Sequence, residues 1–416
     1  MSASASPAPR TIHLSSADNV IVAVDTIDKG VTVHGIAALD RVPRGHKMAV
    51  KPLGEGEPVI KFGQIIGFAT KAVAPGTWLH EHNVGMRDFE RDYRFAEDAK
   101  QEDILPPSLQ ATFQGFRRAN GKVGTRNYIG ILTSVNCSAS AARFMAQEIE
   151  RSGILNDYPH IDGVIPLVHG GGCALDLKGE GYDILKRTQW GYATNPNMAG
   201  VVMVGLGCEG FQISRWKDAY GITESDMFRT MTIQEVGGTK KTVAAGVEAI
   251  KTMLPIANKA KRETVPASEL MLALQCGGSD GYSGITANPA LGAAVDLLVH
   301  HGGTAILSET PEIYGAEHLL TRRAATREIG EKMVGMIKWW EDYTARNKME
   351  MNNNPSPGNK AGGLTTILEK SLGAAAKGGT RTLTGVYHYA EPVTAKGFVY
   401  MDTPGYDPVA ATGQVA

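Results

Sequence analysis

The hydrophobic and polar positions of this chain change their pattern along its length. Residues 11–85 hold short apolar or alternating runs, among them NVIVAV, HKMAV and QIIGFAT, with Gly, Asp and Pro between them. Such runs predict strands joined by turns, and therefore a small β-rich module. Residues 86–112 are charged at first and then contain proline, which predicts a linker.

From residue 113 onward, apolar strand-like runs alternate with amphipathic stretches, which predicts helices covering a parallel sheet. The amphipathic stretches are ASAARFMAQEIER, KKTVAAGVEAIKTMLPIANKAKR, NPALGAAVDLLVHH and EIGEKMVGMIKWWEDYTARN. A charged KAKRE near residue 262 suggests two α/β domains, at 113–262 and 263–416. After Asn347 we expect irregular chain, in which NNNPSPGNKAGG forms a loop long enough to be functional or mobile. The predicted fold class is multidomain α/β.

The composition narrows the function classes. The formal net charge is −1, which gives no electrostatic footprint for nucleic acid or for an anionic membrane. No run of 18 apolar residues is present, so we expect no transmembrane helix. The N-terminal MSASASPAPR has no apolar core, which predicts a disordered tail and no signal peptide. We therefore expect a cytoplasmic protein, whose thiols bind metal or react more often than they form disulfides.

The four cysteines of the chain share one local setting. Each closes an apolar run that indicates a buried parallel strand, and the carboxyl ends of such strands carry ligands in α/β folds. These residues are Cys137, Cys173, Cys208 and Cys276. They are candidates for one shared metal site, although some could be small buried hydrophobes instead. Thiolate together with imidazole suits Fe(II) or Zn(II), and thiolates alone suit an iron–sulfur cluster.

Two histidine-containing segments extend this list of candidates. His80 and His82 are two residues apart in a β-prone run, and on a strand both imidazoles would share one face, as a metal site requires. The alternative is a pair of exposed histidines on a loop. In RVPRGHK, His46 and Lys47 follow a turn glycine, a cationic arrangement that suits a carboxylate substrate or simply a surface turn.

Two further motifs lie in the first α/β region. GKVGTRNY places Arg126 and Asn127 before its first strand, and an arginine there can bind a carboxylate through two parallel hydrogen bonds, or else close a turn. VHGGGC places His169 before Cys173, across glycines that let the backbone approach a ligand closely. These glycines lack the full GxGxxG pattern, which argues against a nicotinamide oxidoreductase.

The densest polar stretch is LQCGGSDGYSGITANP, at residues 274–289. Small polar side chains stand there where a core would need hydrophobes, just before a predicted helix, which predicts an anion- or polyol-binding loop. LSETPE and NPSPGNKAGG follow the same pattern. The residues singled out in these three segments are Ser279, Asp280, Ser283, Thr286, Asn288, Glu309, Glu312, Asn354, Asn359 and Lys360.

Taken together, these motifs resemble the altronate/galactarate dehydratase family from about residue 12 to the end. The matching segments are DNVIVAV, RGHK, IKFGQIIGFA, HEHN, GKVGTRN, VHGGGC, NPN, VGLGCE, QCGGSDGYSGITANP, SETPE and NPSPGNKAGGLTTILEKSLG. The resemblance implies an N-terminal β-clip (SAF) module followed by a Rossmann-like α/β dehydratase region. It further implies conversion of a sugar acid to a 2-keto-3-deoxy acid, typically with ferrous iron as cofactor. Relatives continue with a segment carrying a TGRG-like motif, so we expect this chain to be truncated at its C-terminus.

Roles follow as hypotheses. Iron, or alternatively an iron–sulfur cluster or another divalent metal, would be bound by the thiolates and/or by the pair of histidines in HEHN. His46, His169 and Lys47 are the catalytic candidates. The substrate-binding candidates are Arg126, Asn127, Ser279, Asp280, Thr286, Asn288 and Lys360.

The resemblance also bears on the substrate and the assembly. HEHN favours the altronate branch, which places D-altronate ahead of galactarate as the expected substrate. A sulfolactate sulfo-lyase and a non-catalytic sugar-acid-binding relative stay as alternatives. We expect a homodimer.

Overall fold

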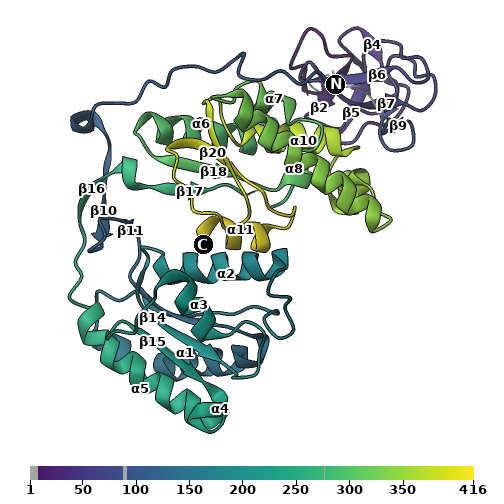
Figure 1. The fold of residues 1–416 in the computed structure, drawn as a ribbon. Helices are drawn as coiled ribbons and strands as arrows, with labels where there is room; N and C mark the ends of the chain where they lie inside the picture. The colour runs from purple at the N-terminus through teal and green to yellow at the C-terminus, as the bar shows by residue number, and fades with distance from the viewer. Residues whose placement is uncertain (1–7, 88–90, 276) are drawn as a thin grey trace, which may run out of the picture.

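The N-terminal part of the protein is an antiparallel β domain (Figure 1). The computed structural model describes residues 8–87, 91–275 and 277–416. The larger sheet has the strand order β1-β2-β5-β8, the second β6-β7-β9, and β3 pairs with β4. The strands are Thr11–Ile12 (β1), Val20–Ala23 (β2), Thr32–Val33 (β3), Ile36–Ala37 (β4), Lys47–Ala49 (β5), Pro58–Lys61 (β6), Gln64–Ala69 (β7), Trp78–Leu79 (β8) and Val84–Gly85 (β9). They are short because glycine turns interrupt them, as at Gly45, whose φ of 83° suits glycine.

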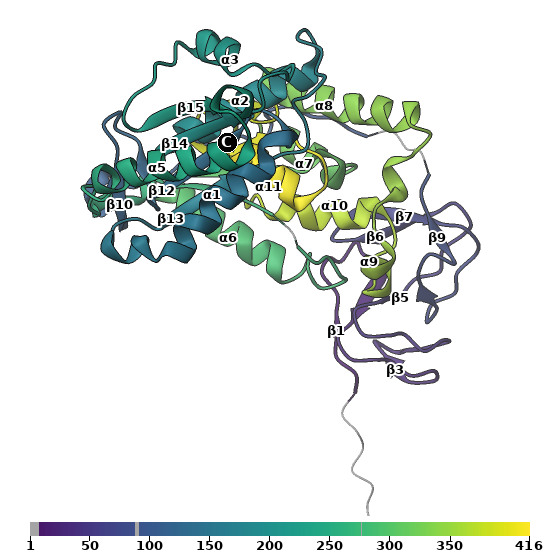
Figure 2. The ribbon, with the colours of Figure 1, turned by 90° about the horizontal axis from the view of Figure 1, so that it is seen from below.

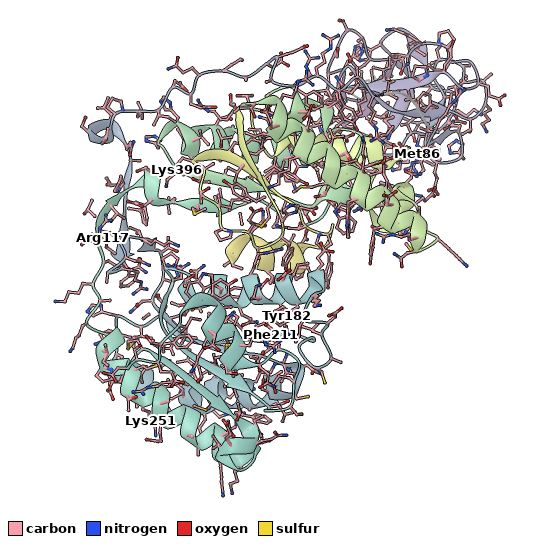
Figure 3. All side chains as sticks on the ribbon, in the orientation of Figure 1. Met86, Arg117, Tyr182, Phe211, Lys251 and Lys396 are labelled. Atoms are coloured by element: carbon pink, nitrogen blue, oxygen red, sulfur yellow. The ribbon has the colours of Figure 1, made fainter. Side chains whose placement is uncertain are left out.

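The second domain is built on a parallel sheet with the order β13-β12-β14-β15. Its strands are Tyr128–Thr133 (β12), Gly163–Leu167 (β13), Met198–Gly205 (β14) and Phe228–Thr232 (β15). Helices α1 (Ala139–Ser152), α4 (Ile233–Val236) and α5 (Thr239–Ala257) pack on one face, and α2 (Glu180–Thr194) and α3 (Ile213–Tyr220) on the other (Figure 1). On that second face Tyr182 packs against Phe211, with ring centroids 5.5 Å apart (Figure 3).

The third domain repeats this plan with the strand order β17-β18-β20-β19, again all parallel. Its strands are Met271–Ala273 (β17), Thr304–Leu307 (β18), Leu383–Tyr387 (β19) and Gly397–Met401 (β20). Its helices are Ala287–His300 (α6), His318–Thr321 (α7), Arg327–Arg346 (α8), Pro357–Ala361 (α9), Ile367–Ala376 (α10) and Asp407–Val415 (α11). Three strands, Thr112–Arg117 (β10), Val123–Gly124 (β11) and Glu263–Pro266 (β16), form a separate antiparallel sheet between the two domains.

The fold class predicted from the sequence is confirmed: an antiparallel β region precedes parallel α/β sheets. Helices α1, α5, α6 and α8 form where the amphipathic stretches predicted them. The irregular chain expected after Asn347 is wrong beyond the loop, because α10, β19, β20 and α11 follow it. Helix α10 escaped detection because ILEKSLGAAA is buried on nearly every side and therefore has no polar face.

The third domain lies between the other two (Figures 1 and 2). The N-terminal domain packs on it through a shared core in which Leu53 and Val59 meet Leu372 and Ala375. The second domain contacts it through α2 and α11, where the Tyr192 hydroxyl donates to Thr412 O at 3.3 Å. No helix in the described ranges combines the length and apolar character needed to cross a membrane.

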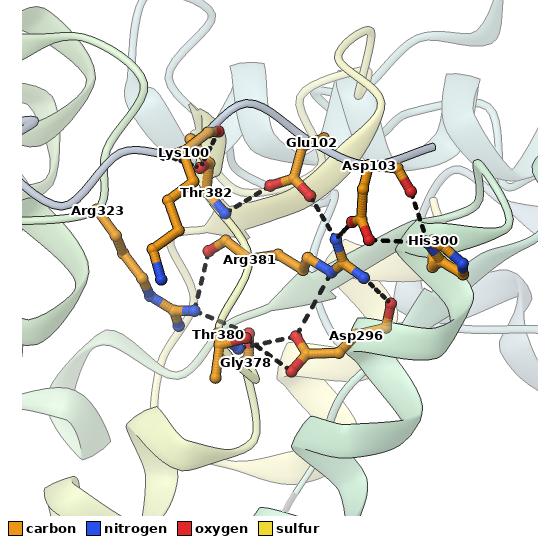
Figure 4. Close-up of polar contacts among 10 residues, drawn as sticks. All are labelled: Lys100, Glu102, Asp103, Asp296, His300, Arg323, Gly378, Thr380, Arg381 and Thr382. Atoms are coloured by element: carbon orange, nitrogen blue, oxygen red, sulfur yellow. Dashed lines mark hydrogen bonds and ion pairs between the residues drawn. The ribbon is translucent and has the colours of Figure 1, made fainter. Parts of the chain in front are cut away.

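The segment between the N-terminal and second domains is held along the third domain (Figure 4). Arg381 pairs with Glu102 and Asp103, and the Thr382 amide donates to Glu102 Oε1 at 2.8 Å. The Leu105 amide donates to His300 O at 2.8 Å. These contacts fix the path of the linker and thereby help to hold the N-terminal domain against the third domain.

Candidate active site

The carboxyl edge of the third-domain sheet carries a polar pocket. Gly277 follows β17, Glu312 follows β18 and Asp407 follows β20, which are adjacent strands of the sheet. This is the edge at which parallel α/β sheets bind ligands. The cavity has a volume of about 370 Å³. We call it the third-domain pocket; it is lined by Gly277, Glu312, Asn353, Asn354, Ser356, Asn359, Lys370, Gly405, Tyr406 and Asp407.

A nearly buried ion pair forms the wall of this pocket. Lys370 Nζ donates to Glu312 Oε1 at 2.8 Å and to Asn354 Oδ1 at 2.9 Å, and the Asn354 amide donates to Glu312 Oε1 at 3.0 Å. The two charged side chains are only 9% and 8% exposed. Glu312 Oε2 is buried without a donor among the described residues. The wall of the pocket therefore contains a fixed ammonium and an amide, and one carboxylate oxygen of Glu312 is buried beside them without a donor among the described residues.

The sequence SPGN builds the opposite side of the pocket. Ser356 caps α9 by accepting from the Asn359 amide at 3.4 Å, and Asn359 Oδ1 accepts in return from the Ser356 amide at 3.2 Å. Pro357 at the first helical position is already fixed in a helical φ. This capping box turns the Asn359 side chain back, and its Nδ2 donates to Ser279 O at 2.8 Å. The two polar loops of the sequence are thereby joined.

The predicted residues of the 274–289 loop lie beside this pocket. Ser279, Asp280 and Asn288 line a small recess that also includes Lys370. Asp280 Oδ1 accepts from the Tyr282 and Ser283 amides at 2.9 Å each, so it holds the turn in shape. Thr286 is exposed and donates to Tyr282 O. Ser283 lines the same recess, so the structure brings four of the five residues singled out in this loop close to Lys370.

A buried charge cluster joins this region to the N-terminal domain. Glu369 receives Lys47 Nζ at 2.8 Å and Lys61 Nζ at 2.9 Å. Lys47 also donates to Gly363 O at 2.6 Å, which uses all of its protons. Burial lowers the pKa of Lys47 to about 8, although Glu369 acts against it. Burial alone would raise the pKa of Glu369, but the two ammonium groups outweigh it and lower that pKa to about 2.

His46 ties the N-terminal domain to the same segment. Its Nδ1 accepts from Trp78 Nε1 at 3.2 Å and its Nε2 donates to Ala361 O at 3.1 Å. Burial lowers the pKa of His46, which therefore favours the neutral ring. Nearby, Lys360 pairs with Glu81 at 3.1 Å.

The strand expected through His80 and His82 is wrong, because β8 ends at Leu79 and both histidines lie in the turn before β9. Their rings flank Trp78, with centroids 5.4 and 5.0 Å from its ring. Burial, followed by the charge of Lys47, lowers the pKa of His80 to about 4. His80 Nδ1 is buried with no hydrogen-bond partner in the described structure, so it is free to serve as a ligand.

The carboxyl edge of the second-domain sheet carries the described cysteines. Cys137, Cys173 and Cys208 follow β12, β13 and β14, three adjacent strands, and all three thiols are exposed and free. Their loops touch: the Asn136 amide donates to Gly171 O at 2.9 Å and the Gly210 amide to Cys173 O at 2.6 Å. We call this the cysteine edge. Cys276 lies outside the described residues.

His169 lies at the cysteine edge with both ring nitrogens occupied. Nε2 donates to Thr133 O at 2.8 Å and Nδ1 accepts from the Gly171 amide at 3.2 Å, while burial lowers the pKa of His169. Arg126 and Asn127 lie at the other, amino end of β12. Arg126 is exposed and donates to Thr125 O, whereas Asn127 is buried and accepts from Arg118. The structure therefore does not group these two with the 274–289 loop.

A resident metal requires a group of ligands at one point. Among the described residues, which leave out Cys276, no three His, Cys, Asp or Glu side chains are grouped closely enough to hold a metal ion. The free imidazole nitrogen of His80 belongs to the N-terminal domain, and the three free thiols belong to the second domain. These described residues alone do not fit an iron centre with three protein ligands.

Three family models match successive parts of the chain. The altronate/galactarate dehydratase SAF domain covers residues 9–87, the second domain of D-galactarate dehydratase/altronate hydrolase covers 115–258, and the D-galactarate/altronate dehydratase C-terminal domain covers 267–416. The chain is 36% identical over 410 residues to altronate dehydratase of Bacillus subtilis (strain 168), covering 97% of this chain and 81% of that protein.

The chain belongs to the altronate/galactarate dehydratase family. It is a hydro-lyase of this type, as the sequence motifs predicted. Galactarate dehydratase (L-threo-forming) of Escherichia coli (strain K12) is 37% identical over 416 residues, covering 97% of this chain and 79% of that protein. Altronate dehydratase of the same organism is 34% identical over 407 residues, covering 96% and 80%.

Several residues of the third-domain pocket and of the buried charge cluster beside it were missed from the sequence. Glu369 and Lys370 lie inside the apolar run ILEKSLGAAA, and Asp407 lies near the end of the chain. The available signal was the adjacent charged pair itself, because charges seldom enter a fully buried helix unless they are paired. Lys61 gave no comparable signal, since its partner lies 308 residues further along the chain.

Proposed function

We propose that this family member dehydrates a C6 sugar acid to a 2-keto-3-deoxy acid in the third-domain pocket, with D-altronate ahead of galactarate. The observation that carries the proposal is the fixed Lys370–Glu312–Asn354 group at the carboxyl edge of the sheet. A polyhydroxy carboxylate needs a cation for its carboxylate and several hydrogen-bonding groups for its hydroxyls, and this pocket has both. The HEHN motif supports altronate, whereas the percentage identities to altronate and galactarate dehydratases are nearly equal.

The reaction requires removal of the C2 proton and departure of the C3 hydroxyl. The C2 proton becomes acidic only when the negative charge of the substrate carboxylate is offset, and the Lys370 ammonium is positioned to do this. Glu312 Oε2 is the proposed base, because it is a buried acceptor with no donor of its own. Asn354 and Asn359 would hold the hydroxyl groups and so fix the face of the substrate that Glu312 meets.

The other residues singled out in the sequence keep their roles as proposals. Ser279, Asp280, Thr286 and Asn288 would shape the loop beside Lys370. Proton transfer by His46, His169 or Lys47 requires one of their present hydrogen bonds to open, since each of these side chains has its nitrogen donors or acceptors engaged. Orientation of the substrate by Arg126, Asn127 or Lys360 also stays a prediction.

Ferrous iron, an iron–sulfur cluster or another divalent metal, with ligands from the cysteines and from His80 and His82, stays a prediction. A metal would supply a Lewis acid that offsets carboxylate charge or polarises a hydroxyl. The homodimer and the cytoplasmic location expected from the sequence stay predictions too.

The test is a substrate panel assayed anaerobically with ferrous iron, with 2-keto-3-deoxy acid formation as the readout. The panel contains D-altronate, galactarate, other hexonates and hexarates, and sulfolactate. We expect turnover of a C6 sugar acid, and weak or no turnover of sulfolactate, because a site built to pair with hydroxyls discriminates against analogues that lack them. Turnover of sulfolactate alone would reject the proposal. Tight binding of a sugar acid without product would instead identify a non-catalytic relative.

A further inference from the structure

Glu309 has an unusual backbone conformation directly after β18. Its φ of 71° and ψ of 64° lie in the left-handed region, where a non-glycine residue is uncommon. Its amide donates to Thr403 Oγ1 at 2.9 Å, which ties the residue to the segment that follows β20. A conformation of this kind is strained and persists only where the surroundings enforce it, often at a functional site. The result is that the side chain of Glu309 turns into the protein behind the third-domain pocket.

The buried carboxyl of Glu309 has one strong partner and one free oxygen. Oε2 accepts from Lys377 Nζ at 3.0 Å, and the two side chains are 1% and 0% exposed. Oε1 is buried and meets no donor among the described residues. The neighbouring acid with which the Glu309 carboxyl interacts is Asp407, which lines the pocket. Two carboxyl groups share a hydrogen bond only when one of them carries a proton.

The surrounding charges favour that proton. Besides Lys377, the titratable groups facing Glu309 are Glu312 and Asp407 at the pocket and the buried Tyr400 of β20. Burial raises the pKa of Glu309 to about 7, with Lys377 acting against this and Glu312 adding to it. Three carboxyl groups therefore stand near two ammonium groups, those of Lys370 and Lys377, and their charges balance only when one carboxyl carries a proton.

We propose that Asp407 is the acid that protonates the departing C3 hydroxyl, and that Glu309 is a positioning residue that keeps a proton on the Glu309–Asp407 pair. This rests on the proposed function, because it assumes that the sugar acid occupies the third-domain pocket. Asp407 lines the pocket and meets the substrate, whereas Glu309 acts only through Asp407.

The step balances without any further reactant. Glu312 takes the C2 proton, and the electron pair of that C–H bond becomes the C2–C3 double bond. The C3–O bond breaks, and the oxygen leaves as water with the proton from Asp407. The enol that remains becomes the 2-keto acid when it receives a proton at C3 and loses one from the C2 hydroxyl. The carboxylate of Asp407 then regains a proton from solvent, and Glu312 releases one.

The experiment compares two leaving groups. Wild type, Asp407→Asn, Asp407→Glu and Glu309→Gln are assayed on the best C6 sugar acid of the panel and on its 3-deoxy-3-fluoro analogue, with fold checked by thermal unfolding. Fluoride leaves as an anion and needs no proton. Asp226→Asn, at an exposed ion pair with Arg229 in the second domain, is the matched carboxyl-to-amide control.

We expect D407N to lower kcat on the sugar acid by about 100-fold or more, in the range of general acid catalysis, with a much smaller loss on the fluoro analogue. D407E should recover part of the activity. In E309Q, the high-pH fall of kcat should shift to lower pH, because the pair no longer holds its proton as strongly; a merely structural role of Glu309 would not move it.

Equal losses of D407N on both substrates, or an unchanged pH profile in E309Q, would overturn the proposal while leaving the proposed function standing. Wild type that dehydrates no sugar acid would reject both. The D226N control should match wild type in all of these assays.

Discussion

The second and third domains present the same sheet edge with different chemistry. Each has a four-stranded parallel sheet, and each places side chains after three adjacent strands. The cysteine edge exposes three free thiols, and its buried acid, Glu209, accepts from Ser134 and from the Leu206 and Gly207 amides of its own turn. The third-domain pocket instead holds Glu312 and Lys370 as a nearly buried pair.

The shared sheet topology puts both sites at the carboxyl edge, whereas the side chains that pair there determine the chemistry of each site. Charges that are fixed and shielded from water stabilise a change of charge in a substrate, because they need not reorganise during the reaction. The thiols of the cysteine edge are free and exposed, so a metal ion or an oxidant can reach them. The third-domain pocket is therefore the better candidate for proton transfer, while metal binding at the cysteine edge stays a prediction that Cys276, outside the described residues, would have to complete.

The N-terminal domain contributes to this difference through one helix. Adjacent residues of α10 point in directions about 100° apart, so Glu369 meets Lys47 and Lys61 while Lys370 enters the third-domain pocket. The buried charge cluster thus anchors the helix that carries the pocket lysine. We infer that the N-terminal domain serves the pocket by positioning α10.

The largest expected effect comes from breaking that anchor. Glu369→Gln leaves two buried ammonium groups without their carboxylate, and we expect a loss of about 3–5 kcal/mol in the free energy of unfolding. Denaturant unfolding measures it. Glu263→Gln, at an exposed ion pair with Arg117, should cost no more than about 1 kcal/mol. Equal stabilities of the two variants would contradict the inference that the buried charge cluster anchors α10.

Next in size is the effect of removing the pocket cation. Lys370→Met leaves Glu312 without its ammonium partner and removes the charge that offsets the substrate carboxylate, so kcat/KM on the best sugar acid should fall by about 100-fold. Lys396→Met, on the N-terminal side of β20, should retain the wild-type value. Full activity in K370M would show that the reaction does not take place in the third-domain pocket. The cysteine edge would then be the better candidate for the reaction site.

The cysteine edge is tested by its iron content. A ligand thiolate replaced by serine weakens metal binding, whereas a non-ligand thiol tolerates the change. We expect serine at Cys137, Cys173, Cys208 or Cys276 to lower the iron content of anaerobically purified protein in at least two of the four cases. Metal and sulfide analysis measures this. Wild-type iron in all four variants would leave the cysteine edge without a role in metal binding.

The smallest expected effect is a loss of free energy of unfolding at acid pH. The pKa of Glu369 is about 2 in the folded protein against 4.5 for the free side chain, so its contribution is present above pH 4.5 and is lost as the pH falls towards 2. Lowering the pH from about 4.5 to about 3 should cost about 2 kcal/mol, at about 1.4 kcal/mol per unit. E369Q should lack this loss; the same loss in E369Q would assign it to other carboxyl groups.

The sequence was most informative where a pattern is local. Strand runs ending at cysteines, amphipathic helices and polar loops depend on neighbours in the chain, and they predicted α1, α5, α6, α8 and both parallel sheets. The 274–289 and 354–360 loops were identified because small polar residues stood where a core needs hydrophobes.

What the sequence could not supply is long-range pairing. Lys47 and Glu369 are 322 residues apart, and Glu309 and Asp407 are brought together only when β18 and β20 become neighbours. The strand expected at His80 failed for a local reason: Asn83 closes a turn there by accepting from the His80 amide at 2.9 Å. Charged residues inside buried helices or behind a pocket leave no periodic pattern in the sequence, so their roles can be recognised only in the folded structure.

The most direct test of the account is a crystal structure with a bound C6 sugar acid, obtained with the Asp407→Asn variant to slow turnover. The account predicts that the substrate carboxylate lies within hydrogen-bonding distance of Lys370 Nζ, with C2 facing Glu312 and the C3 hydroxyl facing position 407. A sugar acid bound at the cysteine edge, away from Lys370, would contradict it.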